Sequence, residues 1–242
     1  CYNPSQQLLY VANINGKPSD IDSNGFISQL DLDGKILKLK WITGLSAPKG
    51  MGVFKDWLYV TDINRLVVID IRAGEIIKTF PVENSVFLND VAIDEKGIVY
   101  FSDSSGKNSC IYHLKNGKVE EWQRNEQVSR PNGLYTEKHK LLFGNGGDGK
   151  LKSVSYIDQK ISLKGLSGKS IDGVEAVGGG NYVISDWSGQ IDFVTSKGEV
   201  LMLQNTADKN INAADIEYIM EKKLLLVPTF FDNRVVAYEL KY

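Results

Sequence analysis

The sequence predicts an all-β protein, a six-bladed β-propeller with four-stranded blades. One observation is a five-residue strand pattern that recurs along the 242 residues, at 9–13, 58–62, 99–103, 141–145, 182–186 and 225–229. Its successive copies end 49, 41, 42, 41 and 43 residues apart, and a period of about 40–50 residues is typical of propeller blades. The other observation is the near absence of helical periodicity between these copies.

Each copy is the second strand of a blade, and a third strand follows it. The third strands are rich in β-branched and aromatic residues with rough alternation, at 26–31, 65–70, 110–115, 151–155, 190–195 and 234–239. Five of them lead into a turn, at 33–34, 73–74, 116–117, 157–158 and 197–198. A fourth strand follows the turn, for example at 36–41 or 200–204.

The first strand of a blade lines the propeller axis, and five such segments align, at 48–51, 88–91, 131–134, 171–174 and 213–216. The corresponding residue of the first blade would precede Cys1, and the sixth blade reaches Tyr242 without a fourth strand. We therefore expect an incomplete first strand in blade one, an incomplete outer strand in the last blade, and one N-terminally truncated propeller domain over 1–242.

Composition narrows the possible partners. The net charge is −2, and lysines and arginines are scattered rather than clustered, which argues against a nucleic-acid partner. No apolar run approaches the ~20 residues of a membrane helix. We expect a monomer that acts on a small molecule.

Cys1 and Cys110 form no metal-binding spacing. Cys1 is either the first residue of a mature lipoprotein or an ordinary strand residue, and the repeat favours the second interpretation. The compartment stays open, with a lean toward export in a bacterium.

The second residues of the aligned first strands form a ring around the axis: Lys49, Asn89, Asn132, Asp172 and Ala214. Convergent Asn and Asp oxygens suit a hard cation such as Ca²⁺. A lysine opposes such a cation electrostatically. Lys49 either pairs with Asp172 in place of a metal or meets an anionic or carbonyl group of a ligand.

Further polar residues surround this ring. Asp90 and Asp215 follow two of its members. The ends of the second strands add Asn13, Asp62, Asp103, Asn145 and Asp186, for which turn capping is the favoured interpretation. Trp187, Phe230 and Phe231 are candidates for an apolar wall. His113 and His139 lie outside the ring, so a Ser-His-Asp or Cys-His mechanism lacks its base.

At 87–90, 130–134 and 171–173 the chain resembles the family of senescence marker protein (regucalcin), gluconolactonase and luciferin-regenerating enzyme. The resemblance spans nearly the whole chain and implies a six-bladed propeller with a divalent cation on its axis. It implies that Asn132 and Asp172 are metal ligands, and that Asn89 contacts substrate or is a further ligand. The family's remaining ligand, a first-blade glutamate, has no counterpart, and Lys49 departs from the pattern.

The leading functional hypothesis is a metal-dependent hydrolase of a small lactone or ester. The cation would be Ca²⁺ first, with Zn²⁺, Mg²⁺ or Mn²⁺ as alternatives. Asp172 or Asp90 would take the proton of a bound water, and Lys49 would stabilise the oxyanion. Asn89, Asn132, Lys49, Trp187 and Phe230 would bind substrate. The alternatives are a non-catalytic propeller that binds a ligand or protein, and a strictosidine-synthase-like or arylesterase-like relative.

Overall fold

The protein is a six-bladed β-propeller, as the sequence predicts. The structure, a computed structural model, describes residues 1–166 and 170–241. The chain divides into two compact units: the N-terminal unit, Cys1–Arg124, and the C-terminal unit, Asn125–Tyr242. That residues 1–242 act as one domain stays a prediction.

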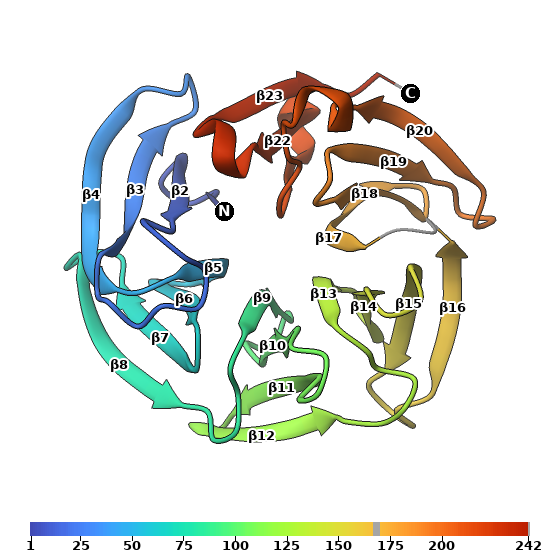
Figure 1. Cartoon of the computed structure of the whole chain (residues 1–242), viewed down its shortest axis with the longest axis horizontal. Coiled ribbons are helices and arrows are strands. Elements are labelled where there is room, and N and C mark those ends of the chain that lie inside the picture. Colours follow the sequence, from blue (N-terminus) through green and yellow to red (C-terminus); the bar gives the residue numbers. More distant parts are fainter. Residues whose placement is uncertain (167–169, 242) are drawn as a thin grey trace. The chain divides into compact units, whose positions relative to one another are not determined.

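The N-terminal unit holds three four-stranded antiparallel sheets (Figure 1). The first sheet consists of β1 (Tyr2–Asn3), β2 (Leu8–Asn13), β3 (Gly25–Asp31) and β4 (Ile36–Leu45). The second consists of β5 (Pro48–Phe54), β6 (Trp57–Asp62), β7 (Arg65–Asp70) and β8 (Glu75–Pro81). The third consists of β9 (Leu88–Ile93), β10 (Val99–Asp103), β11 (Cys110–Lys115) and β12 (Lys118–Gln123).

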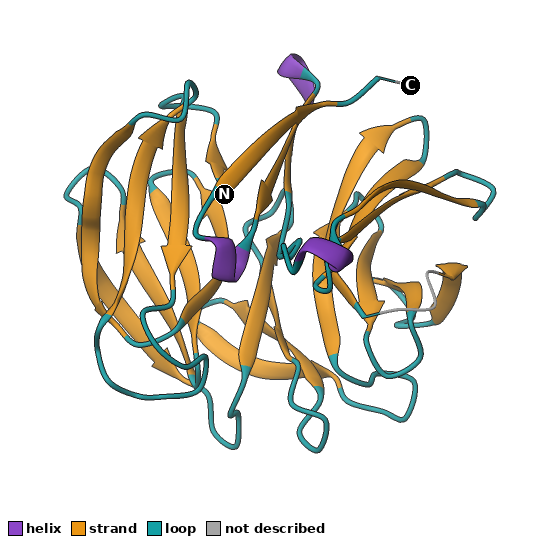
Figure 2. Cartoon of the chain, turned by 45° about the horizontal axis from the view of Figure 1, so that its top comes forward, coloured by secondary structure: helices purple, strands orange, loops and turns teal. Residues whose placement is uncertain are grey.

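The C-terminal unit holds two four-stranded sheets and one of three strands. The four-stranded sheets consist of β13 (Pro131–Thr136), β14 (Lys140–Asn145), β15 (Lys150–Ser155) and β16 (Ile161–Leu166), and of β17 (Ile171–Gly178), β18 (Asn181–Asp186), β19 (Gln190–Val194) and β20 (Val200–Asn205). The last consists of β21 (Glu217–Ile219), β22 (Leu224–Pro228) and β23 (Val235–Glu239). Figure 2 shows short 3₁₀ helices beside these strands, namely η1 (Ala207–Lys209), η2 (Met220–Lys222) and η3 (Phe230–Asp232).

The first and last sheets agree with the expectation of incomplete strands. β1 is two residues long and pairs Tyr2 with Leu9, and the last sheet has no fourth strand among the described residues. The position of the first strand of the sixth blade was predicted wrongly, because its ladder begins at Glu217 rather than at residue 213. Ala214 still donates its N–H to the Pro228 carbonyl over 3.0 Å, but a bend at Asp215 separates that bond from the regular ladder.

Three of the first strands, β5, β13 and β17, each carry a β-bulge next to the predicted ring residue. A glycine follows the ring residue there because a neighbouring backbone is too close for a side chain. A Cβ on Gly50 would lie 2.4 Å from the Asp90 Cα, and one on Gly173 would lie 2.6 Å from the Ile216 nitrogen. The glycines therefore permit close packing of successive first strands.

Buried hydroxyl groups satisfy the backbone at these bulges. The Ser185 hydroxyl accepts the Gly173 N–H over 2.9 Å and donates to the Ala214 carbonyl over 2.7 Å. In the N-terminal unit, the Thr61 hydroxyl donates to the Asn89 carbonyl. A buried backbone group without such a partner costs about 1–3 kcal/mol, so these hydroxyls stabilise the backbone positions of Asn89 and Ala214.

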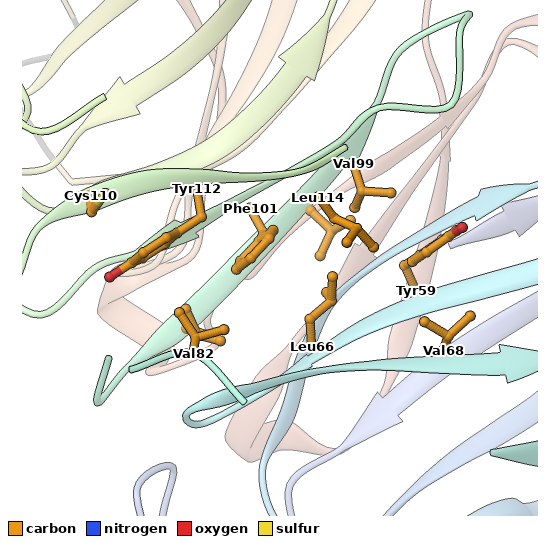
Figure 3. Close-up of a cluster of buried hydrophobic side chains, with 11 residues drawn as sticks. Tyr59, Leu66, Val68, Val82, Val99, Phe101, Cys110, Tyr112 and Leu114 are labelled. Carbon is orange, nitrogen blue, oxygen red and sulfur yellow. The ribbon is translucent and has the colours of Figure 1, made fainter. Parts of the chain in front are cut away.

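Hydrophobic cores lie between consecutive sheets within each unit. Figure 3 shows the core between the second and third sheets, made by Tyr59, Leu66, Val68, Val82, Leu88, Val91, Val99, Phe101, Cys110, Tyr112 and Leu114. Phe101, Leu66 and Leu88 are completely buried, and each such side chain contributes roughly 2–3 kcal/mol by leaving water. In the described part of the chain, no helix is long and apolar enough to cross a membrane.

Candidate functional site

The strand register brings the two predicted sets of polar residues to the same end of each sheet. Leu88 pairs with Asp103, Pro131 with Asn145, and Ile171 with Asp186. Each ring residue comes directly after the first member of such a pair. The polar residues that end the second strands therefore border the ring residues of their own blades.

The residues that end the second strands cap loops, which supports the turn-capping interpretation. The Asp62 carboxylate accepts the N–H groups of Ser46 and Ala47 at 3.0 and 2.7 Å. The Asp103 carboxylate accepts the Val86 N–H at 3.0 Å. Asn145 accepts an N–H in the same way, from Ser129 at 2.7 Å. These bonds hold the segment that leads into the first strand.

In the N-terminal unit, Lys49 is held by a loop of the first sheet. Its Nζ donates to the carbonyls of Pro18 and Ala47 over 2.9 and 3.1 Å, and lies 4.5 Å from the centre of the Phe87 ring. Burial lowers the pKa of Lys49 to about 8, although the charges of Asp62 and Asp103 oppose the shift. Carbonyl oxygens and an aromatic face thus contact the ammonium group directly, and the charges of Asp62 and Asp103 also favour its charged form.

Asn89 and Asp90 are also in the N-terminal unit, and they are held differently. Asp90 is buried, and its carboxylate accepts the Val91 N–H over 2.6 Å. The Asp90 N–H donates to the Ser102 hydroxyl over 3.0 Å. Asn89 is half-buried, and its carbonyl accepts the Thr61 hydroxyl. Their predicted catalytic and ligand-binding roles stay predictions, as does the role of Lys49.

In the C-terminal unit, the structure brings Asn132 and Asp172 together. The Asn132 side-chain amide donates an N–H to the Asp172 carboxylate. Asn132 is only 8% exposed, and Asp172 is half-buried. They occupy equivalent positions on β13 and β17, which lie side by side. The structure thus brings these two ring residues into contact, and their roles as metal or substrate ligands stay predictions.

The surroundings of Asp172 favour its protonated form. Burial is the largest cause and the Asp215 charge the next, and together they raise the pKa of Asp172 to about 7, with a smaller contribution from Asp186. The Asn132 N–H stabilises the carboxylate and opposes this shift. A group that ionises near neutral pH can both accept and return a proton under ordinary conditions.

An aromatic cluster made by Trp187, Phe230 and Phe231 lies on loops of the last two sheets. The Trp187 ring centre is 5.7 Å from that of Phe230 and 6.1 Å from that of Phe231, and the two phenyl rings are 4.7 Å apart, all edge to face. Trp187 is 42% exposed and Phe231 70% exposed. The buried Asn212 amide, which the sequence analysis did not single out, donates to the Trp187 carbonyl over 2.8 Å.

The expected divalent cation lacks a complete set of ligands. Among residues 1–166 and 170–241, no group of three or more His, Cys, Asp or Glu side chains is arranged to hold a metal. The Asn132 amide turns an N–H rather than its oxygen toward Asp172, whereas Ca²⁺ takes about six to eight oxygen ligands. The Asn132–Asp172 pair as arranged does not fit that cation.

Two contacts of the site were not predicted. The contact of Lys49 with the Pro18 carbonyl depends on where the loop between β2 and β3 folds, which no local pattern reveals. The length of that loop, 11 residues between Asn13 and Gly25, was the only signal for it. Phe87 directly precedes Leu88 and is half-buried. Nothing in this sequence position predicted that its ring would lie beside the ammonium group of Lys49.

Comparisons with known proteins reveal a shared fold. No protein-family model and no curated protein sequence matches the chain. A catalytically inactive virginiamycin B lyase from Staphylococcus aureus, solved with quinupristin, is 16% identical with a TM-score of 0.67, over 94% of this chain and 83% of that chain. A streptogramin B lyase is 14% identical with a TM-score of 0.65, over 96% and 99%. A chain of a nidogen/laminin complex is 15% identical with a TM-score of 0.74, over 90% and 87%.

The likeness is one of fold. Lyases and a propeller in a protein complex share it, so the architecture alone is compatible with catalysis and with binding.

Proposed function

We propose that this protein hydrolyses a small lactone or ester, with Asp172 as the general base and Asn132 as the residue that positions it. The observation that carries the proposal is the hydrogen bond from the buried Asn132 amide to the Asp172 carboxylate. It fixes one carboxylate at the start of β17, on the end of the sheet where Asp186 finishes β18. The resemblance to lactone-hydrolysing propellers and the fold shared with lyases support an enzymatic role.

The reaction needs only a water molecule and the ester. The Asp172 carboxylate removes a proton from the water molecule while the water oxygen attacks the carbonyl carbon of the ester. The carbon–oxygen single bond of the ester then breaks, and the proton held by Asp172 passes to the departing alkoxide. The product of a lactone is the open hydroxy acid, and Asp172 returns to its ionised form.

The electrostatics of the site support this role. A base is most effective when its pKa lies near the working pH, and burial together with the Asp215 charge brings the pKa of Asp172 to about 7. The proposed steps involve no metal, because the Asn132–Asp172 pair as arranged does not present the oxygen ligands that Ca²⁺ takes. The predicted Ca²⁺, or Zn²⁺, Mg²⁺ or Mn²⁺, is tested separately by elemental analysis of the purified protein.

The second candidate is a non-catalytic propeller that binds a ligand or protein. It is favoured by the exposed aromatic rings of the C-terminal unit and by the likeness to a propeller in a nidogen/laminin complex. The two candidates differ in a single property, turnover.

The test is hydrolysis of a panel of small lactones and aryl esters. We expect turnover by the unmodified protein, a fall of about 100-fold or more in Asp172→Asn, and a smaller fall in Asn132→Ala. Asp208→Asn, which changes an exposed acid of η1, is the matched control and should keep full activity. Unchanged turnover in Asp172→Asn contradicts the proposal. No turnover by the unmodified protein also contradicts it and favours the binding propeller.

A further inference from the structure

The aromatic cluster of Trp187, Phe230 and Phe231 leaves a large apolar area in water. Apolar rings that close a core are buried on most sides, as Phe101 and Phe143 are here. Phe231 keeps 70% of its surface exposed and Trp187 42%. The three rings contact one another edge to face, so their outer surfaces form one apolar platform.

The backbone at the cluster is held in an unfavourable conformation. Phe230 has a φ of +52°, a left-handed conformation that costs a non-glycine residue about 1–2 kcal/mol. The turn of η3 keeps this conformation and directs two consecutive phenylalanines to the Trp187 ring. Eleven other described non-glycine residues also have a positive φ, so this conformation orients the rings and does not by itself mark a binding site.

Trp187 of the platform lies at the same end of its sheet as Asp172 of the proposed catalytic pair. Trp187 comes directly after Asp186, which pairs with Ile171, and Asp172 is the next residue of β17. The Asp186 charge acts on the Asp172 carboxyl, so these neighbouring groups lie within electrostatic range. Phe230 and Phe231 follow the end of β22, whose Pro228 carbonyl accepts the N–H of Ala214, the ring residue of the last blade.

We propose that the platform binds a flat apolar substituent, such as a phenyl ring, carried by the substrate close to its ester carbonyl. This inference rests on the proposed function, because it assigns the substrate class of the same site. A phenyl ring offers an edge or face that matches the edge-to-face arrangement of the cluster. The adjacent Asn132 and Asp172 then face the polar part of the same molecule.

The experiment compares two lactams, because a lactam resists hydrolysis and reports binding without turnover. The probes are γ-butyrolactam and γ-phenyl-γ-butyrolactam, titrated by NMR into the unmodified protein, Phe231→Ala and Trp57→Ala. Trp57 is the matched control, since it is 45% exposed and lies in the N-terminal unit. Phe231 is too exposed for its loss to unfold the protein, and a thermal melt checks this.

We expect the phenyl lactam to bind the unmodified protein about tenfold more tightly than the parent lactam. Phe231→Ala should remove this preference, and Trp57→Ala should keep it. Equal binding of the two lactams, no binding of either, or a preference that survives in Phe231→Ala overturns the inference. If the preference is found in a protein that hydrolyses no lactone, the platform stands and the proposed catalysis fails.

Discussion

Burial moves the two ring residues Asp172 and Lys49 toward their neutral forms, with pKa shifts of opposite direction. Asp172 lies near two other acids, Asp215 and Asp186, and its pKa rises to about 7. Lys49 is bound by two carbonyl oxygens and its pKa falls to about 8. Desolvation is the largest cause in both cases, since it disfavours whichever form is charged.

The raised pKa of Asp172 predicts a pH-dependent gain in stability on its replacement. The folded protein holds this proton up to about pH 7, whereas the unfolded chain releases it near pH 4. The free energy of unfolding therefore falls as the pH rises through this window. Asp172→Asn keeps the acceptor for Asn132 and removes the charge, so we expect it to raise the stability by roughly 1–3 kcal/mol at pH 8, and to leave it unchanged at pH 4.

Urea unfolding at the two pH values measures this effect. Asp208→Asn, an exposed acid in the same unit, is the control and should show no such difference. Equal stability of Asp172→Asn and the unmodified protein at pH 8 would show that the carboxylate suffers no penalty in the fold.

At the scale of elements, the glycines of the first strands set how closely the blades pack. In β5, the space beside Gly50 is occupied by the backbone of Asp90, whereas the space beside Gly52 is occupied by the Ile93 side chain. Backbone cannot move aside without disturbing β9, but the end of an isoleucine side chain can shift by a few tenths of an ångström.

The two glycines of β5 therefore form a matched pair of variants. We expect Gly50→Ala to lower the free energy of unfolding by about 3 kcal/mol or more, because its Cβ would lie 2.4 Å from the Asp90 Cα. Gly52→Ala, whose Cβ would lie 3.0 Å from Ile93, should cost about 1 kcal/mol or less. Chemical denaturation of both variants provides the comparison, and an equal loss would show that the close backbone approach at Gly50 has no special weight.

Repeat spacing predicted the strands well because each blade repeats the same local pattern. All six second strands lie within one residue of their predicted positions, for example β10 at Val99–Asp103. The first strand of the sixth blade was misplaced. Residues 213–216 have the sequence pattern of a first strand, but they do not form the regular ladder that the other blades form there. Spacing reveals which residues are equivalent, but it does not reveal where a ladder ends.

The repeat predicted those contacts of the site that join residues at equivalent positions of successive blades. Asn132 and Asp172 meet because they share a position on adjacent strands. The contact between Lys49 and Pro18 is not a repeat feature, since it depends on an irregular loop. The metal prediction depended on how the Asn132 amide is oriented, and spacing does not reveal this orientation.

At the scale of the whole molecule, the fold is built from six antiparallel sheets, and the last sheet differs from the rest because it has three strands among the described residues. Its third strand, β23, has no fourth strand beside it among the described residues. On the preceding sheet, Leu201 of β20 pairs with Phe193, which packs in the core shared with the last sheet, yet Leu201 is 58% exposed. Apolar residues of other outer strands are exposed to a similar degree, for example Leu39 of β4 at 55% and Leu163 of β16 at 57%.

The claim that the half-buried carboxylate of Asp172 acts as a base is tested most directly by the pH dependence of kcat/KM for a hydrolysed lactone. The account predicts a rate that rises with pH and levels off above an apparent pKa near 7. Asp172→Asn should abolish both the activity and this inflection. A profile without an inflection near pH 7, or the same inflection in residual activity of Asp172→Asn, would contradict the account.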